Sequence, residues 1–392
     1  MPHRERLLSI LWTNMNLPDI PLWLYPVAFL AVLGPLVFVH EYGHYIVGRW
    51  CGVKADTFSI GFGRKILGWT DKRGTEWKIG WLPLGGYVQF AGDRDAVSQP
   101  DADWQQLPAE QKSHTFPAQP VWKRALIVAA GPFTNFLFAI AIIAGFVMAY
   151  GTYQSPAVIG QVQAGLPAAA AGLQPGDRIT AIDGQPIEGF EDIMAAISYD
   201  LARPVDLSVE RSGERFSLNL TPRIITETDR FGNTSERAII GIRAGEPVHV
   251  AMGPLAAIEH GVERTGTIIR MTASVLGQFV TGDRSIKEMG GPVKIAKTSG
   301  EIATLGVEEL IAFAAFISIN LGFINLLPLP MLDGGHLFFY AYEAIRRRPA
   351  PPQAQEWAFR FGFAAIVTLM LVVTFNDLGS LGLWDGIARL IG

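Results

Sequence analysis

Two histidines and a glutamate with metalloprotease spacing are the residues of this chain best suited to chemistry. His40, Glu41 and His44 form the pattern His-Glu-x-x-His. On a helix, which turns about 100° per residue, the two histidines lie on one face, where both imidazoles can bind one zinc ion. Glu41 then projects toward a water molecule beside the metal and can take its proton. Composition alone predicts only about 0.01 chance occurrences of this pattern in the chain.

A catalytic zinc ion needs a third protein ligand and one open position. Asp333, in the sequence Leu-Asp-Gly-Gly-His, is the best candidate, and His336 is its rival. Gly334 and Gly335 favour a close approach of the backbone around Asp333 over a zinc-binding helical turn, so Asp333 is ranked first. The sequence therefore predicts one Zn²⁺ per chain, bound by the two histidines of the motif and Asp333.

Two prolines and two amides precede Asp333 in the same uncharged run. Pro328 and Pro330 each remove a backbone N–H and break the helical hydrogen-bond pattern, so the chain around them should be unwound. Unwound backbone at membrane depth is tolerated where it is buried in protein or lines a water-filled cavity. A simple proline kink is the alternative, but the amides of Asn320 and Asn325 beside the carboxylate favour a site.

Long apolar runs carry these residues. Uncharged runs occupy residues 21–39, 125–150, 310–332 and 361–376. A helix crosses the hydrocarbon core in about 20 residues, so all four are predicted to span a membrane. Buried helices of a large soluble protein are the alternative, but charged residues make up only 17% of the chain and the mean hydropathy is +0.25. The first run lacks a basic start and a small-residue cleavage site, which excludes a cleavable signal peptide.

The overall charge and the cysteine content exclude two classes of function. The net charge is −4, so no basic excess is present to neutralise a nucleic-acid backbone. Cys51 is the single cysteine, which excludes an intrachain disulfide and a cysteine-based zinc cage.

Lysine and arginine placement predicts the orientation in the membrane. Basic residues are concentrated in residues 48–124 and in the block 346–348, so both segments should be cytoplasmic. Residues 151–309 and both termini then lie outside. Arg4 and Arg6 oppose this orientation but are outnumbered.

The outer segment begins with the pattern of a small soluble module. Residues 155–222 read as a strand, the sequence Ala-Ala-Gly-Leu-x-x-Gly-Asp, a second strand, a helix over 190–199 and a hairpin. This order resembles a PDZ domain, which binds extended peptides by adding a strand to a sheet edge. The alternative is a structural β-domain that binds nothing.

Two further segments are expected to lie at the membrane. Residues 76–79 and 87–90 flank an apolar Leu-Pro-Leu-Gly-Gly tip and are predicted to form a cytoplasmic β-hairpin. Residues 252–280 are apolar with interspersed charges, which is typical of an amphipathic helix on the membrane surface. Residues 93–119 are polar and predicted to be a loop.

Together these motifs resemble the site-2 protease family. His-Glu-x-x-His in the first span, Gly-Pro-Phe-Thr-Asn at residues 131–135, the PDZ pattern and Asn-x-x-Pro-x-Pro-x-Leu-Asp-Gly-Gly in the third span carry the resemblance over nearly the whole chain. The bacterial regulator-of-sigma-E proteases are the most similar group. Their enterobacterial type has two PDZ domains in tandem, whereas residues 223–245 are too short for a second one here.

The resemblance implies intramembrane proteolysis and a role for each motif. His40, His44 and Asp333 would bind zinc and Glu41 would be the general base. Residues expected to contact the substrate are Asn320, Asn325, Pro328, Pro330, Gly85, Gly86 and Tyr87, the last three in a membrane-associated β-loop that presents the substrate as a strand.

The sequence thus predicts a polytopic α-helical membrane protein with four transmembrane helices, a periplasmic β-rich PDZ domain and a cytoplasmic membrane-associated β-hairpin. The expected partners are the lipid bilayer, single-pass membrane proteins such as anti-sigma factors or signal peptides, and a peptide bound to the PDZ domain; the location is the bacterial inner membrane. A non-catalytic PDZ scaffold and a metal-handling membrane protein are the alternatives. The predicted segments are 1–50 (N-terminus and first span), 51–120 (β-loop), 121–150 (second span), 155–222 (PDZ), 223–309 (linker and amphipathic region), 310–345 (third span) and 357–378 (fourth span).

Overall fold

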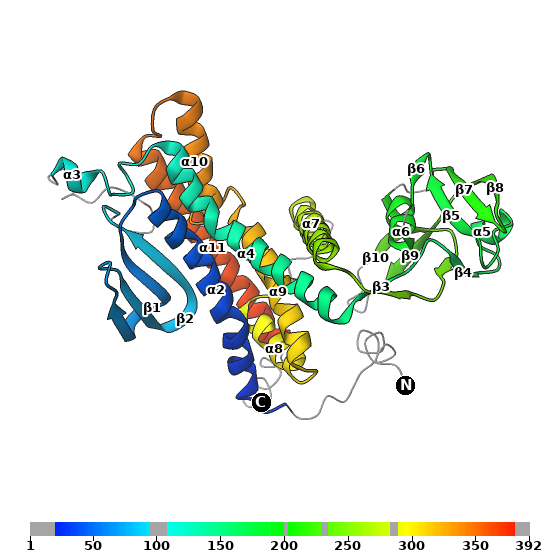
Figure 1. Ribbon diagram of the computed structural model, residues 1–392, viewed down its shortest axis with the longest axis horizontal. Helices are drawn as coiled ribbons and strands as arrows, with labels where there is room; N and C mark the ends of the chain where they lie inside the picture. Colours follow the sequence, from blue (N-terminus) through cyan, green and yellow to red (C-terminus); the bar gives the residue numbers. More distant parts are fainter. Residues whose placement is uncertain are drawn as a thin grey trace, which may run out of the picture. The chain divides into compact units, whose positions relative to one another are not determined.

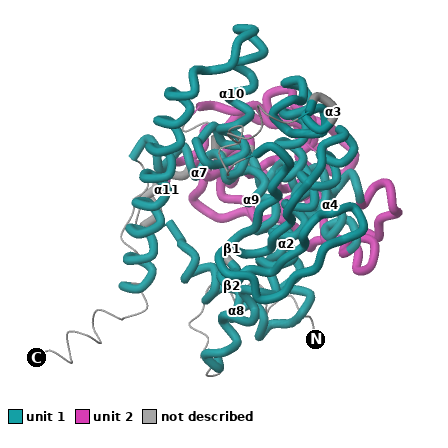
Figure 2. Tube along the Cα trace, turned by 90° about the vertical axis from the view of Figure 1, so that its left-hand side faces the viewer, with its two compact units in different colours: residues 1–145, 258–392 teal, residues 146–257 magenta. Residues whose placement is uncertain are grey.

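The computed structural model describes residues 20–93, 108–187, 189–199, 203–228, 234–282 and 289–380. The chain divides into two compact units, which Figure 2 colours separately. Unit 1 comprises residues 1–145 and 258–392, and unit 2 comprises residues 146–257. Residues 1–19 of the predicted first segment and most of the predicted polar loop, residues 94–107, lie outside the described residues.

The predicted spans are confirmed as four helices long and apolar enough to cross a membrane. They belong to one bundle in unit 1 (Figure 1). Uncharged helices of this length are stable only where lipid or other helices surround them, because their apolar side chains are excluded from water. Their bounds are α2 (Leu24–Trp50), α4 (Val121–Tyr150), α9 (Val307–Asn325) and α11 (Pro352–Ser380).

The third predicted span, residues 310–345, is interrupted where the two prolines stand. Helix α9 ends at Asn325, and the next helix, α10 (Asp333–Arg346), begins at the candidate ligand. Met331 has a φ of +81°, a left-handed conformation that is uncommon for a residue other than glycine. The predicted unwinding before Asp333 is therefore confirmed, and this segment ends in a tight turn that opens α10.

Two β-strands follow the first span, β1 (Ala55–Thr70) and β2 (Glu76–Phe90). The predicted hairpin between residues 76–79 and 87–90 is wrong in its pairing. Phe58 pairs with Trp77 on one side and with Val88 on the other, so residues 55–60 lie between the two halves of β2. Ala55, Phe58 and Ser59 are fully buried, which explains why this segment takes the central position. Residues 86–90 are then left at an edge of the sheet.

Further helices of unit 1 are α3 (Ala109–Lys112), α7 (Pro254–Thr281), which begins at the end of unit 2, and α8 (Pro292–Ala303). Helix α8 contacts α2, α9 and α11. Asp377 of α11 accepts hydrogen bonds from the backbone N–H groups of Gly291 and Lys294, each at 3.0 Å, which satisfies two N–H groups at the start of α8. Helix α8 thus links the first, third and fourth apolar helices.

Unit 2 has the strand and helix order predicted for the PDZ-like module. Its largest sheet has the order β6-β5-β7-β8, and β7 and β8 form the predicted hairpin. Three further strand pairs are β4 with β11, β3 with β12 and β9 with β10. The bounds are β3 (Thr152–Gln154), β4 (Ile159–Val162), α5 (Pro167–Ala170), β5 (Arg178–Ile182), β6 (Gln185–Pro186), α6 (Phe190–Tyr199), β7 (Val205–Arg211), β8 (Glu214–Leu220), β9 (Arg223–Thr228), β10 (Thr234–Ile239), β11 (Ile242–Ala244) and β12 (Val248–Val250).

The compact unit extends beyond residue 222, where the predicted PDZ domain ended. Ala238 and Ile240 are buried in the same apolar core as Ile179, Ile193 and Leu207. Most of the described residues between 223 and 250 are thus strands of this unit, whereas residues 254–281 form a helix, so the predicted 223–309 linker divides between the two units.

Candidate active site

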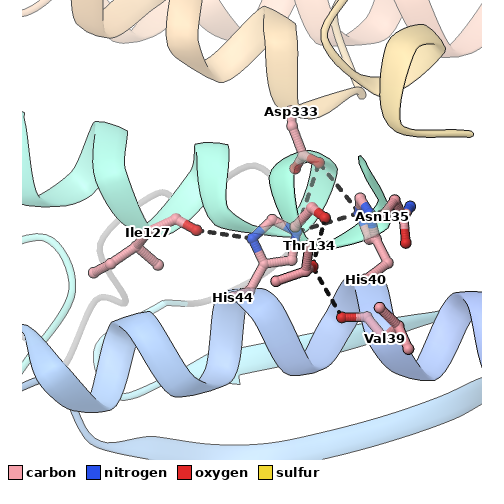
Figure 3. A network of polar contacts seen from close by, with 8 residues as sticks. Val39, His40, His44, Ile127, Thr134, Asn135 and Asp333 are labelled. Atoms are coloured by element: carbon pink, nitrogen blue, oxygen red, sulfur yellow. Dashed lines mark hydrogen bonds and ion pairs between the residues drawn. The ribbon is translucent and has the colours of Figure 1, made fainter. Parts of the chain in front are cut away.

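Helix α2 presents both histidines of the motif to one point. His40 and His44 are one turn apart on the helix, and their Nε2 atoms lie 3.3 Å from each other. Both side chains are nearly buried, with exposed fractions of 11% and 12%. Figure 3 shows the two rings pointing away from α2 toward the start of α10.

Asp333, the first residue of α10, meets both rings. Its Oδ2 atom lies 3.2 Å from His40 Nε2 and 3.5 Å from His44 Nε2 (Figure 3). Ligand atoms held at 2.0–2.1 Å by a tetrahedral zinc ion are separated by roughly 3.3 Å. The three measured separations therefore fit one tetrahedral metal site, and among the described residues these three form a group that could hold a metal ion.

On each histidine, the Nδ1 nitrogen carries the ring proton and uses it in a hydrogen bond. The two Nε2 atoms, which face Asp333, are therefore left without a proton. The Nδ1–H of His44 donates to the carbonyl oxygen of Ile127 at 2.9 Å. The amide nitrogen of Asn135 lies 3.2 Å from Nδ1 of His40, and the Oδ1 atom of Asn135 has no partner among the described residues. Rotating this amide by 180° lets Oδ1 accept the Nδ1–H. Both Nε2 atoms and the unpartnered Oδ2 of Asp333 then present lone pairs to one point, which a cation satisfies.

Glycines allow α4 to approach the histidines closely. A Cβ atom added to Gly131 would lie 2.2 Å from Nε2 of His44, so only glycine leaves space for that ring. Gly43, inside the His-Glu-x-x-His motif, similarly lies against Ala130 and Thr134. The close crossing of α2 and α4 thus depends on one small residue in each helix.

Glu41 lies beside this group and is held by the sheet. Its side chain is buried and within electrostatic range of His40, His44 and Asp333. The backbone N–H of Val88, in the edge segment of β2, donates a hydrogen bond to its carboxylate. Gly86 packs against the side chain of Glu41, and a Cβ at that position would lie 2.8 Å from its Cγ. The strand therefore positions the candidate base.

The turn before Asp333 also requires glycine. Cβ atoms added to Gly334 and Gly335 would lie 2.1 Å from the carbonyl oxygen of Leu327 and 2.4 Å from that of Leu329. The close backbone approach that ranked Asp333 above His336 is therefore present. The ring of His336 packs instead against Phe359 of α11, at a centroid distance of 5.0 Å.

The predicted substrate-contact residues do not form one cluster. Asn325 ends α9, half-buried, and none of the hydrogen bonds between described residues uses its amide. Asn320 instead accepts a hydrogen bond from Thr272 of α7 at 2.8 Å. Pro330 is packed beneath Gly362 of α11, and Pro328 is exposed.

The remaining predicted residues lie in β2. The ring of Tyr87 stacks on Phe62 with centroids 6.1 Å apart, and Lys78 lies 4.9 Å above it. Gly85 has a φ of +153° and packs against the same phenylalanine ring. These residues continue the edge segment that holds Glu41.

Sequence reasoning did not identify the groups that orient the histidines and Glu41. Asn135 is fully buried within an apolar helix, where an amide is disfavoured unless it has a specific partner. An asparagine inside the uncharged run 125–150 therefore could have been predicted to have a role in the site. The carbonyl oxygen of Ile127 and the N–H of Val88 leave no side-chain signal, because any residue supplies them.

Comparison with known proteins identifies the family of this chain. The model of peptidase family M50 matches residues 28–369. A protein of Agrobacterium fabrum named as a zinc metalloprotease is 46% identical over 362 residues, covering 91% of this chain and 96% of its own. Metalloprotease MmpA of Caulobacter vibrioides is 37% identical over 376 residues, covering 90% and 94% respectively.

Solved structures match a smaller part of the chain. The PDZ domain of an SdrC-like protein from Listeria monocytogenes is 22% identical and covers 24% of this chain and 90% of its own, with a TM-score of 0.19. The family match, by contrast, extends over the first three apolar helices, unit 2 and most of α11. The chain belongs to peptidase family M50, the site-2 protease family, and is a zinc metalloprotease.

Proposed function

We propose that this protease is an intramembrane zinc endopeptidase that cleaves single-pass membrane proteins within or near their transmembrane segment. His40, His44 and Asp333 would hold one Zn²⁺, and Glu41 would act as general base. The observation that carries the proposal is the convergence of the three ligand atoms at 3.2–3.5 Å, with a buried carboxylate beside them.

The chemistry divides between the metal and the chain. Zinc, when bound by these residues, would supply Lewis acidity for activating water and polarising the scissile carbonyl group. Glu41 accepts a proton from the attacking water and passes it to the nitrogen of the leaving amine. The N–H of Val88 and the packing of Gly86 hold the Glu41 carboxylate in place during both transfers.

Substrate presentation would use the edge of the sheet and the broken third span. A transmembrane helix satisfies its own backbone groups, so a few residues must unwind before a carbonyl can reach the metal. The edge segment 86–90, with Gly85, Gly86 and Tyr87, offers strand pairing to the unwound backbone. Asn325 would donate to the substrate backbone or the developing oxyanion. Pro328 and Pro330 keep the donor segment unwound, and Asn320 would be a further contact.

Unit 2 would act as a periplasmic PDZ domain that binds an extended peptide. The protein would lie in the bacterial inner membrane, with its active site near the cytoplasmic side. The order of its strands and helices supports the PDZ assignment. The family resemblance favours anti-sigma factors or leftover signal peptides as substrates, cleaved after a first protease has removed most of the outer domain.

Low helix stability near the cytoplasmic side of the substrate span, rather than one side chain, should govern cleavage. Glycine and proline weaken a helix by roughly 1 and 3 kcal/mol relative to alanine, so they should raise cleavage when placed in that stretch. A panel of spans matched in hydrophobicity and graded in helix propensity measures this. Cleavage that followed a single required side chain would contradict it.

The substitution Glu41→Gln tests the proposed mechanism. The glutamine amide cannot accept the proton, so cleavage of a membrane-anchored reporter should be abolished while the zinc content stays at one ion per chain. Metal analysis and the cleavage assay are made on the same purified protein. Near-wild-type cleavage would overturn the mechanism.

A non-catalytic PDZ scaffold, which the family assignment disfavours, is tested by the same variant. A scaffold does not need Glu41, so a reporter that remains uncleaved by the wild-type protein but is captured equally by wild type and Glu41→Gln would favour it. Capture of uncleaved substrate by Glu41→Gln, with cleavage by wild type, favours the protease.

A further inference from the structure

Helix α10 must be positioned by contacts of its own. The chain between α9 and α10 is unwound and turns sharply at Met331, so the direction of α9 does not fix the direction of α10. Yet Asp333, the first residue of α10, must reach both histidines of α2 if the three residues are to share one metal ion. The contacts made further along α10 therefore decide whether the third ligand is in place.

A charged contact joins the far end of α10 to the start of α4. The guanidinium group of Arg124 donates to the Glu343 carboxylate at 2.8 Å, and its Nε–H donates to the backbone carbonyl of Gln119 at 3.1 Å. Its central carbon lies 4.9 Å from the centre of the Tyr340 ring, which is buried. The side chains of Arg124 and Glu343 are only 17% and 18% exposed, so solvent screens the pair weakly. One arginine thus contacts two residues of α10.

Both charges are unfavourably placed within their own helices. Arg124 lies in the first turn of α4, where the helix dipole disfavours a cation. Glu343 lies in the last turn of α10, where the dipole disfavours an anion. Because the two residues meet, each charge lies against the oppositely charged end of the neighbouring helix. The ion pair therefore stabilises the contact between α4 and α10 and not the helix that carries either residue.

The start of α4 is also joined to α2, which carries both histidines. Lys123 Nζ donates at 3.0 Å to the carbonyl oxygen of Cys51, the residue that follows α2. The ring of Tyr340 belongs to the same apolar core as Tyr45 of α2 and Val128 of α4. The end of α2 and the end of α10 are thus both held to the first turn of α4, so their positions along it are linked.

We propose that Arg124 and Glu343 are positioning residues of the metal site, whose ion pair fixes α10 along α4 so that Asp333 reaches both histidines. At 1.5 Å per residue the pair lies about 15 Å from Asp333 along one continuous helix. It touches none of the metal ligands, so its effect on them passes through the placement of α10. This inference rests on the proposed metal site but on no step of the proposed proteolysis.

Titration of the metal-free, full-length protein with Co²⁺ in detergent tests this role without a substrate. The visible absorption of Co²⁺ reports the geometry of its ligands. Arg124→Glu should weaken Co²⁺ binding by roughly 10–100-fold, as is typical for residues that support metal ligands, and should shift the spectrum toward that of Asp333→Ala. Glu343→Gln, which keeps the shape of the side chain, should change both in the same direction but less. Arg124→Glu with Glu343→Arg reverses the pair and should restore the wild-type spectrum.

An ion pair within one helix is the matched control. Glu356→Gln with Arg360→Gln removes the exposed 2.6 Å pair of α11 and should bind Co²⁺ as wild type does. Thermal unfolding of each metal-free variant separates positioning from stability. If Arg124→Glu and Glu343→Gln melt at lower temperature but keep the wild-type affinity and spectrum, or if the reversed pair restores neither, the proposal is overturned. A wild-type spectrum in Asp333→Ala would instead contradict the proposed metal site, and this inference with it.

Discussion

At the scale of single residues, the candidate site depends on which nitrogen of each histidine ring carries the proton. The Nδ1 atoms of His40 and His44 are engaged by Asn135 and by a backbone carbonyl, so their Nε2 atoms are left to face Asp333. Burying this arrangement without a cation costs free energy, because the lone pairs of the two Nε2 atoms and of the Asp333 carboxylate would face one another.

The substitution Asp333→Ala should lose both proteolysis and zinc affinity, whereas His336→Ala should retain both. Removing a ligand should lower zinc affinity by more than the 10–100-fold typical of outer-shell partners. The His336 ring packs on Phe359 and is absent from the metal-binding group of described residues. Zinc titration of both purified variants measures the difference. Loss of zinc in His336→Ala alone would reverse the choice of third ligand.

Gly131→Ala should disrupt the candidate site by steric overlap alone. The added Cβ would lie 2.2 Å from His44 Nε2, so the ring must move and zinc affinity should fall by roughly 10–100-fold. Gly145→Ala in the same helix is the matched control, since its Cβ would meet nothing within 4 Å. The control should keep zinc and activity and stabilise the helix by about 0.5–1 kcal/mol. Equal zinc affinities in the two variants would contradict this account.

At the scale of secondary-structure elements, β2 holds the side chain of Glu41 of α2 against the sheet. Val88→Pro removes the N–H that donates to Glu41, so cleavage should fall at least about tenfold while the zinc content stays unchanged. Val88→Ala keeps the N–H and is the matched control. Metal analysis and reporter cleavage distinguish the variants. A loss of zinc in Val88→Pro would mean that the strand supports the metal-binding group and not only the base.

Within unit 2, a buried ion pair joins the start of β5 to β7. The hydrogen bonds from Arg211, at 2.6 and 2.7 Å, hold the pKa of the buried Asp177 carboxyl below its ordinary 3.8. A lowered folded-state pKa adds stability above the unfolded-state value and loses it as the pH falls through the folded-state value. The contribution of this pair should therefore be complete above about pH 5 and decline below pH 3.8.

Urea unfolding of residues 146–257, followed by circular dichroism, measures this contribution. Asp177→Asn should lower the free energy of unfolding by about 2 kcal/mol at pH 7, and its difference from wild type should shrink toward pH 2. Asp183→Asn, in the more exposed pair with Arg203, is the control and should change stability by less than about 1 kcal/mol. A difference for Asp177→Asn that is constant with pH would exclude the ion pair as its cause.

At the scale of the whole molecule, four apolar helices and the placement of basic residues predict one orientation. Gly213→Cys should be labelled only from the periplasm, and Lys72→Cys and Arg347→Cys only from the cytoplasm. Membrane-impermeant maleimides applied to intact and opened cells report this, and the native Cys51 is buried and should label weakly. The reverse pattern would place the active site toward the other face of the membrane.

The sequence alone predicted everything that follows from local pattern. Apolar runs of about 20 residues predicted the four apolar helices. His-Glu-x-x-His predicted that His40 and His44 lie on one helix face, because helical spacing places i and i+4 together without help from the rest of the fold. Two prolines predicted the break before Asp333, because their missing N–H groups act locally. The strand and helix order of unit 2 was likewise readable up to β8.

Only the tertiary structure decided which distant groups meet. The contact of Asp333 with both histidines, and of the His336 ring with Phe359, depends on how α10 packs against α2 and α11, and the contact of Asn135 with His40 depends on the crossing of α2 and α4. The position of residues 55–60 between the two halves of β2 was unpredictable from a hairpin pattern. Ala238 and Ile240 joined the core of unit 2 from outside its predicted bounds. Each of these is a non-local contact, and local periodicity carries no information about which surfaces will be buried together.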